Sequence, residues 1–215
     1  MTSRVDAVFD LTGSRICRGI FLPGEALTAE AVQAEADCSR TVAREALGLL
    51  VSLGLLRVRR RIGYEVRPAE HWSRLSPDVL RWLLAGPDSV RVLHELMDLR
   101  SVVEPAAAAA PAAAQDGGAV EPASRLWAAA AAADRDSFLA ADVDFHRAVL
   151  RAGGNRLFEA LGALIAESLP PRADAGEQLS LSEARAHLDL ADAIVAGDAD
   201  AARSLAASLT EHGGA

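Results

Sequence analysis

The stretch 39-SRTVAREALGLLVSLGLL-56 decides the fold of the N-terminal part of this 215-residue chain. Its first turn is polar and basic, and the apolar residues behind it recur at helical spacing. Ser39 is a residue type that caps the free amides of a first helical turn, while Arg40 and Arg44 lie one turn apart on one face. The stretch therefore predicts an amphipathic helix that presents two guanidinium groups near its N-terminal end.

The basic face of this helix allows two interpretations. Guanidinium groups at a helix end can bind phosphates, or the O6 and N7 atoms of guanine in a major groove. Pairs of Arg are also common on the solvated faces of ordinary helices. The elements on either side of the helix are needed to decide between them.

The flanking segments complete a small domain around this helix. A first helix is predicted over residues 4–19, and a second runs from a cap at Thr28 to about Asp37. Behind the basic helix, a turn joins two β-leaning segments, residues 56–59 and 64–67. Three helices followed by a hairpin form the order of a winged helix-turn-helix domain, which favours the nucleic-acid interpretation.

The net charge of −8 is unevenly distributed along the chain. Residues 1–67 carry ten Arg and eight acidic residues, a balance of +2, whereas residues 68–215 carry twelve Arg and twenty-two acidic residues, a balance of −10. We therefore expect phosphates to be bound by the first part and repelled by the second. The basic turn at Arg59, Arg60 and Arg61 suits phosphate contact, although such residues could equally form a solvated turn.

The remainder of the chain is predicted to be an all-α bundle. Apolar residues make up 51% of the sequence and aromatic residues 4%, and the abundance of Ala indicates closely packed helices. Residues 68–75 lack a clear period and are predicted to be a linker that Trp72 anchors. Helix signals follow at 76–86, 88–115, 121–133, 136–152, 155–169, 180–196 and 199–211. We expect a mainly α protein with a winged helix-turn-helix domain at 1–67, a linker at 68–75 and a helical domain at 76–215.

Asp142 and His146 form a candidate pair of metal ligands in the predicted bundle. They lie four residues apart on an otherwise apolar helix, so both side chains share one face. His187 lies in another amphipathic helix, and His212 lies near the end of the last one. Such side chains from several helices can close around a divalent metal such as zinc. By spacing alone, a capped or salt-bridged pair is the more frequent explanation.

Residues 5–67 resemble the N-terminal domain of the GntR family of bacterial transcription regulators. The resemblance rests on Pro23-Gly24, Leu27, Ser39-Arg40, Val42, Arg44-Glu45-Ala46-Leu47, Leu50, Gly54-Leu55 and Gly63-Tyr64-Glu65-Val66. It implies that operator DNA is contacted by Ser39, Arg40, Thr41 and Arg44, with Gly63 of the wing approaching the minor groove. Ala31 and Ala43 depart from the usual pattern, so the operator sequence is expected to differ.

Three later segments resemble FCD, the C-terminal ligand-binding domain of the FadR subfamily of GntR regulators. They are 95-ELMDLRSVVEPAAAAAPAAA-114, 142-DVDFHRAVLRAGGN-155 and 186-AHLDLADAIVAGDADAA-202. The segment 76-SPDVLRWLL-84 is similar to members that respond to sugar acids such as galactonate. The resemblance implies a small carboxylate bound to a metal, with Arg100 facing that pocket.

The metal ligands that this resemblance implies are Asp142, His146 and His187, with a further His on the last helix. This chain departs from the pattern because Leu209 stands at the expected position of the fourth ligand. His212 follows three residues later. Either His212 substitutes for that ligand, or three ligands hold the metal, or no metal binds. A divalent metal is the preferred interpretation, with zinc as the expected ion.

Nothing in the sequence predicts export or a membrane partner. No apolar run reaches the ~20 residues that cross a bilayer, and the N-terminal residues lack the apolar core of a secretory signal. The isolated Cys17 and Cys38 suggest neither a disulfide framework nor a zinc knuckle. We expect a cytoplasmic protein with reduced cysteines.

The function expected from these observations is that of a regulator, more specifically a repressor, that binds double-stranded operator DNA as a homodimer. A small carboxylate such as a sugar acid or hydroxy acid is the expected effector. One alternative is a regulator whose bundle only dimerises. Another is a zinc-dependent hydrolase that uses Asp142, His146 and His187, but an enzyme gives no reason for residues 1–67.

Overall fold

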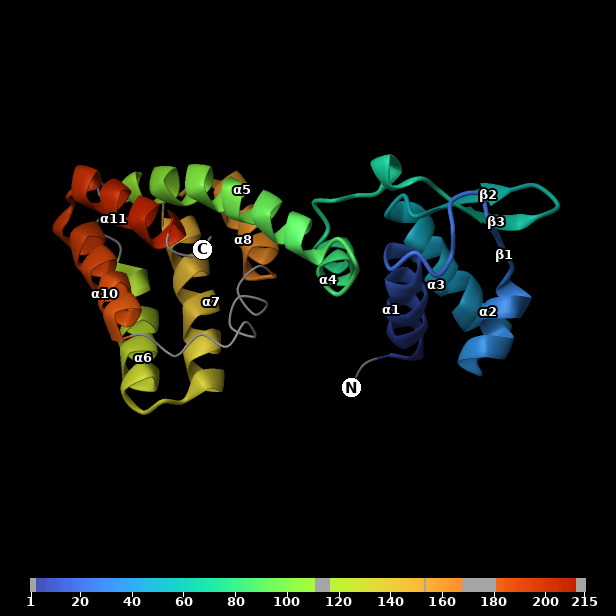
Figure 1. Cartoon of the computed structure of the whole chain (residues 1–215), viewed down its shortest axis with the longest axis horizontal. Coiled ribbons are helices and arrows are strands. Elements are labelled where there is room, and N and C mark those ends of the chain that lie inside the picture. Colours follow the sequence, from blue (N-terminus) through green and yellow to red (C-terminus); the bar gives the residue numbers. More distant parts are fainter. Residues whose placement is uncertain (1–2, 111–116, 153, 168–180, 212–215) are drawn as a thin grey trace. The chain divides into compact units, whose positions relative to one another are not determined.

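The computed structural model describes residues 3–110, 117–152, 154–167 and 181–211. The chain divides into two compact units, residues 1–92 and 93–215. Helices dominate both, and one small antiparallel sheet lies in the first unit (Figure 1). The predicted fold class, a winged helix-turn-helix followed by an all-α bundle, is confirmed. Within the described residues, no helix is both long enough and apolar enough to span a membrane.

The first unit is built in the predicted order of helices and strands. Its elements are α1 (Arg4–Cys17), β1 (Ala26–Leu27), α2 (Ala29–Ala36), α3 (Arg40–Ser52), β2 (Leu56–Arg59), β3 (Gly63–Val66), the short 3₁₀ helix η1 (Ala69–His71) and α4 (Pro77–Leu84). Two predicted caps are confirmed, because the Thr28 hydroxyl accepts from the amide of Ala31 and the Ser39 hydroxyl from that of Val42. Helix α3, which we call the recognition helix, therefore begins one residue after Ser39, as its sequence predicts.

The sheet contains one strand that the sequence did not reveal. The two residues of β1 pair with β3, which gives the antiparallel order β1–β3–β2. Ala26 is opposite Glu65, and Leu56 is opposite Val66. A two-residue strand has too few residues to show alternation, so only its pairing partner defines it.

The linker packs closely onto the first unit. Trp72 donates its indole N–H to the carbonyl of Arg67 at 3.0 Å, so this residue anchors the segment as expected. Gly54 has a φ of +78°, and a Cβ there would lie 2.2 Å from the carbonyl oxygen of His71. Only glycine fits both the backbone angle and this close approach.

Helix α4 packs against α1. The indole ring of Trp82 covers Gly13, where a Cβ would lie 2.3 Å from the ring. The ring of Phe9 contacts the same indole edge to face, with 5.0 Å between the ring centroids. Arg81 forms an ion pair with Asp10, with 2.8 Å between the nitrogen and the oxygen. The predicted helical domain begins at residue 76, whereas these contacts group α4 with the first unit. The helix itself is predictable from its own residues, but its packing depends on side chains about seventy residues away in the chain.

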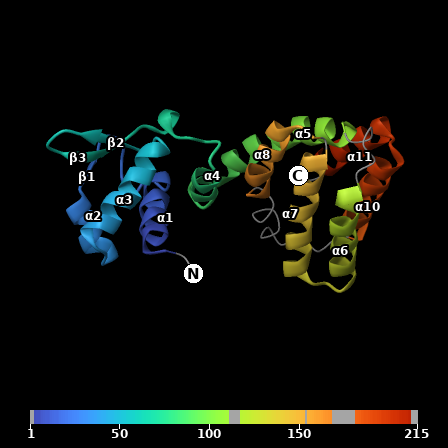
Figure 2. The same ribbon diagram turned by 180° about the vertical axis from the view of Figure 1, so that it is seen from behind.

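The second unit is a bundle of Ala-rich helices. Its elements are α5 (Ser89–Ala109, which begins in the first unit), the 3₁₀ helix η3 (Gly117–Ala119), α6 (Val120–Ala131), α7 (Arg135–Ala152), α8 (Arg156–Ala166), α10 (Leu181–Ala196) and α11 (Ala199–Glu211). Figure 2 shows α6 and α7 side by side, and the two helices contact each other along their lengths. One core cluster collects Phe145 and Leu190 with several buried Ala side chains, which agrees with the close packing that the composition predicts.

Candidate functional sites: a basic groove and a buried histidine cluster

A groove on the first unit lies between the N-terminal ends of α2 and α3 and the hairpin of β2 and β3. Its volume is about 540 Å³. Five of its lining residues are Arg: Arg40, Arg44, Arg59, Arg60 and Arg61. The structure thus brings the basic residues of the recognition helix and of the wing to one surface. A groove lined by guanidinium groups from a helix end and a hairpin suits a phosphate backbone.

The two arginines of the recognition helix remain accessible. Arg40 makes an ion pair with Glu30 at 2.9 Å, and both side chains are more than 60% exposed. Exposed pairs of this kind are weak because water and salt screen them. Arg44 is exposed as well, as are Ser39 and Thr41 at the start of the helix. Neither Arg side chain is therefore locked in a buried ion pair.

The wing arginines differ in what they contact. Arg59 pairs with Glu65 on the neighbouring strand at 3.1 Å, and Arg57, which the sequence analysis did not single out, also pairs with Glu65. Arg60 and Arg61 form the exposed turn between the strands. Of the three predicted phosphate contacts, these two are the ones at the tip of the wing.

Gly63 has a structural reason to be glycine. Its φ is +109°, and a Cβ would lie 3.0 Å from the carbonyl oxygen of Leu27 in β1. The residue begins β3 and follows the turn instead of forming its tip. Close packing against β1 thus gives one structural reason for glycine at this position, apart from any approach to DNA.

In the second unit, Asp142, His146 and His187 come together in a buried cluster. Asp142 and His146 project from α7, and His187 projects from α10. Each residue is no more than 6% exposed. Asp142 Oδ1 lies 3.3 Å from His146 Nε2 and 3.1 Å from His187 Nε2. The three ligand-type atoms lie within 4.8 Å of one another, so one ion could contact all of them.

Two of these three atoms are buried without a hydrogen-bond partner, which favours a shared metal ion. Asp142 Oδ1 and His187 Nε2 are buried without a hydrogen-bond partner, although they are close to each other. Buried polar atoms without partners are costly, so a pair of them needs an explanation. Two ligands bound at about 2.0 Å to one tetrahedral ion are about 3.3 Å apart. The two oxygen–nitrogen separations of 3.1 and 3.3 Å are close to that value, whereas the three atoms together lie within 4.8 Å of one another.

The outer nitrogens of both imidazoles are held by other groups. His187 Nδ1 lies 2.8 Å from the carbonyl oxygen of Glu183, and His146 Nδ1 lies 2.9 Å from Glu104 Oε2. Phe145 contacts both imidazole rings edge to face. Metal-binding histidines usually donate their second N–H to a carbonyl or carboxylate in this way. Both rings therefore direct Nε2 toward Asp142.

Arg100 is fully buried beside this cluster. Its Nε donates to Glu104 Oε1 at 2.8 Å, and one terminal nitrogen lies 3.1 and 3.4 Å from the two ring nitrogens of His146. A nitrogen nearly equidistant from both lies over the face of the ring and not in its plane. Arg100 thus contacts His146 without lying between this ring and Glu104 or Asp142.

The charges in the cluster shift its pKa values. Burial raises the pKa of Glu104, but the neighbouring His146 and Arg100 outweigh it and lower this pKa to about 2. Burial raises the pKa of Asp142 as well, but the neighbouring His146 and His187 imidazoles outweigh it, and the net shift is downward. Burial lowers the pKa of His146, yet Glu104 reverses this and the net shift is upward. The two carboxylates are therefore ionised at neutral pH.

Not every predicted residue of this site can be placed. Arg100 contacts His146, whereas His212 lies outside the described residues. Leu209 is half-buried and packs against the core cluster that contains Phe145. Glu104 was missed by sequence reasoning, although its spacing of four from Arg100 could have signalled a paired group on one helix face.

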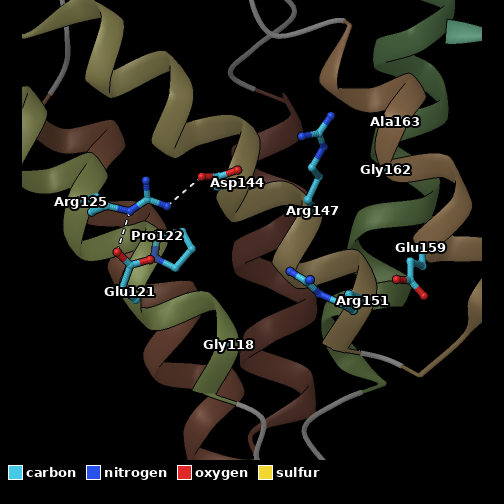
Figure 3. Close-up of a pocket in the computed structure, with 10 residues that line it drawn as sticks. All are labelled: Gly118, Glu121, Pro122, Arg125, Asp144, Arg147, Arg151, Glu159, Gly162 and Ala163. Carbon is cyan, nitrogen blue, oxygen red and sulfur yellow. Dashed lines mark hydrogen bonds and ion pairs between the residues drawn. The ribbon is translucent and has the colours of Figure 1, made fainter.

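A second hollow of about 640 Å³ lies on the outside of α6, α7 and α8 (Figure 3). Arg125 pairs there with Glu121 at 2.7 Å and with Asp144 at 2.8 Å. Arg147 and Arg151 line it from α7. None of the residues of the buried histidine cluster lines this hollow, so the two features are separate.

A winged helix with a basic groove, followed by a helical bundle, is typical of the class of DNA-binding transcription regulators. The pattern of the bacterial regulatory proteins of the gntR family matches residues 5–66, and that of the FCD domain matches residues 95–212. The chain belongs to the GntR family and carries an FCD domain at its C-terminal end.

Relatives of similar length are transcription regulators. The chain is 30% identical to the galactonate operon transcriptional repressor of Escherichia coli K12, over 96% of this chain and 93% of that protein. It is 31% identical to the probable D-xylose utilization operon transcriptional repressor of Paenarthrobacter nicotinovorans, over 98% of this chain and 86% of that protein. The chain is therefore a transcription regulator and not the hydrolase considered from the sequence.

A solved structure shares the fold. It comes from work on Lar, which controls the expression of the agr system of Listeria monocytogenes. Its TM-score with this chain is 0.64 at 15% identity, and the match covers all of this chain and 96% of the other. At this identity the likeness supports the fold alone.

Proposed function

We propose that this protein is a repressor that binds operator DNA as a homodimer and releases it when a small carboxylate binds the C-terminal unit. The basic groove between α3 and the wing supports the DNA-binding half of this proposal. The buried atoms of Asp142 and His187 without partners support the sensing half. The names of the two curated relatives, both repressors of sugar or sugar-acid operons, favour repression.

The proposed DNA contacts are divided between the recognition helix and the wing. Arg40 and Arg44 would reach the major groove, with Ser39 and Thr41 contacting nearby phosphates. Arg60 and Arg61 at the wing tip would neutralise phosphates, and Arg59 would join them if its exposed pair with Glu65 opens. Gly63 would let the wing backbone approach the minor groove.

Dimerisation is proposed on physical grounds. One winged helix contacts few base edges, and a two-fold pair doubles them at a palindromic site. A ligand that binds one arrangement of the pair more tightly shifts the population toward that arrangement. Release of DNA then requires only that the carboxylate prefer the arrangement that fits the operator poorly.

The proposed metal is a zinc ion held by Asp142, His146 and His187. Two imidazoles and one carboxylate are ligands that zinc accepts, and the two oxygen–nitrogen distances are close to those between ligands of one ion. When bound, the ion supplies a dication with open positions for a carboxylate oxygen. The guanidinium of Arg100 lies against the same His146 ring and would favour an acid over a neutral sugar.

The second candidate is a regulator whose bundle dimerises without binding a metal or an effector. Leu209 favours it, because an apolar side chain occupies the position where the family resemblance predicts a fourth ligand. In that case the buried cluster would be a structural network of ion pairs.

The deciding experiment combines metal analysis with a thermal-shift screen of the purified full-length protein. We expect bound zinc that a chelator removes, and a higher melting temperature with a sugar acid or hydroxy acid but not with the matching neutral sugar. A ligand at 100 times its Kd stabilises the folded state by about 2.7 kcal/mol. Absence of metal together with no response to any acid would reject the sensing half and leave the dimerising bundle.

A further inference from the structure

Glu104 is the buried charged residue for which neither the sequence resemblance nor the proposed function has a role. It lies on α5 and is 2% exposed, although a lone carboxylate is rarely buried so deeply. Both of its oxygens are used. Oε1 accepts from Arg100 Nε at 2.8 Å, and Oε2 lies 2.9 Å from His146 Nδ1. The carboxylate thus joins the guanidinium to one of the candidate metal ligands.

We propose that Glu104 is a positioning residue that fixes the tautomer of His146 and thereby makes the Asp142–His146–His187 cluster competent to bind a metal. This inference rests on the proposed metal site and adds a residue to it. An ionised carboxylate only accepts hydrogen bonds, so the proton between the two groups belongs to His146 Nδ1. In the neutral ring the shorter contact, 2.9 Å to Glu104, holds the proton on Nδ1, and the lone pair is on Nε2, which lies 3.3 Å from Asp142 Oδ1.

The Nδ1 atoms of both histidines face an oxygen atom, but the two oxygens come from different groups. His187 Nδ1 faces the backbone carbonyl of Glu183, which any residue at that position would supply. His146 depends on the Glu104 side chain, so substitution of that side chain removes the constraint. Without it the ring could place its proton on Nε2 and lose the atom that faces the other ligands.

Glu104 also determines where Arg100 lies. The pair is one helical turn apart on α5 and is excluded from solvent. A charge-assisted bond in such surroundings fixes the geometry of both partners. The guanidinium is thereby kept over the His146 ring. One carboxylate therefore sets both the proposed metal ligand and the proposed effector contact.

The first test measures the affinity of the full-length protein for Zn²⁺ by competition with a chelating dye. Glu104→Gln keeps an acceptor oxygen and the shape but loses the charge, while Glu104→Leu loses both. Loss of such an outer partner typically weakens metal binding by about 10–100-fold. We expect that loss for Glu104→Gln and a larger one for Glu104→Leu.

Glu121→Gln is the matched control. Glu121 also pairs with an arginine four residues away, Arg125, but on the exposed surface and away from the histidines. The two substitutions change the net charge equally. We expect Zn²⁺ affinity of Glu121→Gln to equal that of the unsubstituted protein. If the Zn²⁺ affinity of Glu104→Gln equals that of the unsubstituted protein, the proposal is overturned.

The second test needs no substitution at Glu104. Nitrogen-15 NMR of the imidazoles in the metal-free protein reports which ring nitrogen of His146 carries the proton, and the resonance is assigned from a His146→Gln spectrum. We expect the neutral ring to carry its proton on Nδ1, and a neutral ring with its proton on Nε2 would overturn the proposal even if the variants fail to fold. If the unsubstituted protein binds no Zn²⁺, the proposed metal site fails, while this measurement still decides the role of Glu104.

Discussion

Arg40 and Arg44 lie in the same groove but differ in their contacts. Arg40 is paired with Glu30, and within the described part of the chain Arg44 has no ion pair. The sequence predicted the position of both residues correctly, because cap and spacing are local properties of one helix. It could not predict the pair with Glu30, which depends on how α2 and α3 meet.

Replacement of Arg44 by Ala is expected to abolish most operator binding. A bidentate arginine contact to a base is worth about 1–3 kcal/mol, so affinity should fall by about 5- to 160-fold. The oligomeric state and the melting temperature should not change, because the side chain is exposed. Gel-shift titration and light scattering measure these properties. Arg18→Ala, an exposed arginine of the same unit that does not line the groove, is the control, and equal binding by both variants would refute the assignment.

At the scale of elements, α4 packs against α1 because Gly13 of α1 leaves room for the Trp82 ring of α4. The α4 sequence contains a clear helix signal, with Pro77 at its first position, although the Ser76 side chain makes no cap bond. Nothing within 77–84 states that Trp82 will cover Gly13 of α1. This contact holds α4 against α1 within the first unit.

We expect Gly13→Ala to destabilise the first unit. The added Cβ would lie 2.3 Å from the buried Trp82 ring, which must then shift, and such overpacking typically costs about 1–3 kcal/mol. Urea unfolding followed by tryptophan fluorescence measures the change.

The helical residue Gly48 provides the comparison for this prediction. A Cβ at Gly48 meets nothing within 4 Å. Gly48→Ala should therefore stabilise α3 by up to about 1 kcal/mol through helix propensity. The close packing of α4 on α1 would be disproved if both substitutions raised stability.

At the scale of the whole chain, charge separates the two functions. The net charge of −8 comes from the residues after 67, while the groove of the first unit collects five arginines. Sequence reasoning found this division because charge is additive along a chain. The concentration of the arginines on one groove required the hairpin to fold back beside α3.

The salt dependence of operator binding should show how many phosphates the wing arginines neutralise. Each phosphate neutralised on duplex DNA contributes about −0.9 to the slope of log K against log salt concentration. Arg60→Ala with Arg61→Ala should therefore make the slope shallower by about 1–2. Fluorescence anisotropy at several salt concentrations measures it.

A control pair for the wing lies on α7, where Arg147→Ala with Arg151→Ala removes two arginines of the second unit. These residues line the outer hollow (Figure 3) and belong to the acidic half of the chain. Their replacement should leave the slope unchanged. A slope that responds to the α7 pair and not to the wing pair would place the DNA elsewhere.

The sequence by itself determined the helices, their caps at Thr28 and Ser39, the hairpin and the separation of charge, since each follows from neighbours within a few residues. It also placed Asp142 and His146 on one helix face. Only the tertiary structure decided that β1 pairs with β3, that Trp82 covers Gly13 and that Glu104 joins Arg100 to His146. These contacts join residues far apart in the chain, and their energies come from burial and from hydrogen bonds that exist only once the helices have packed.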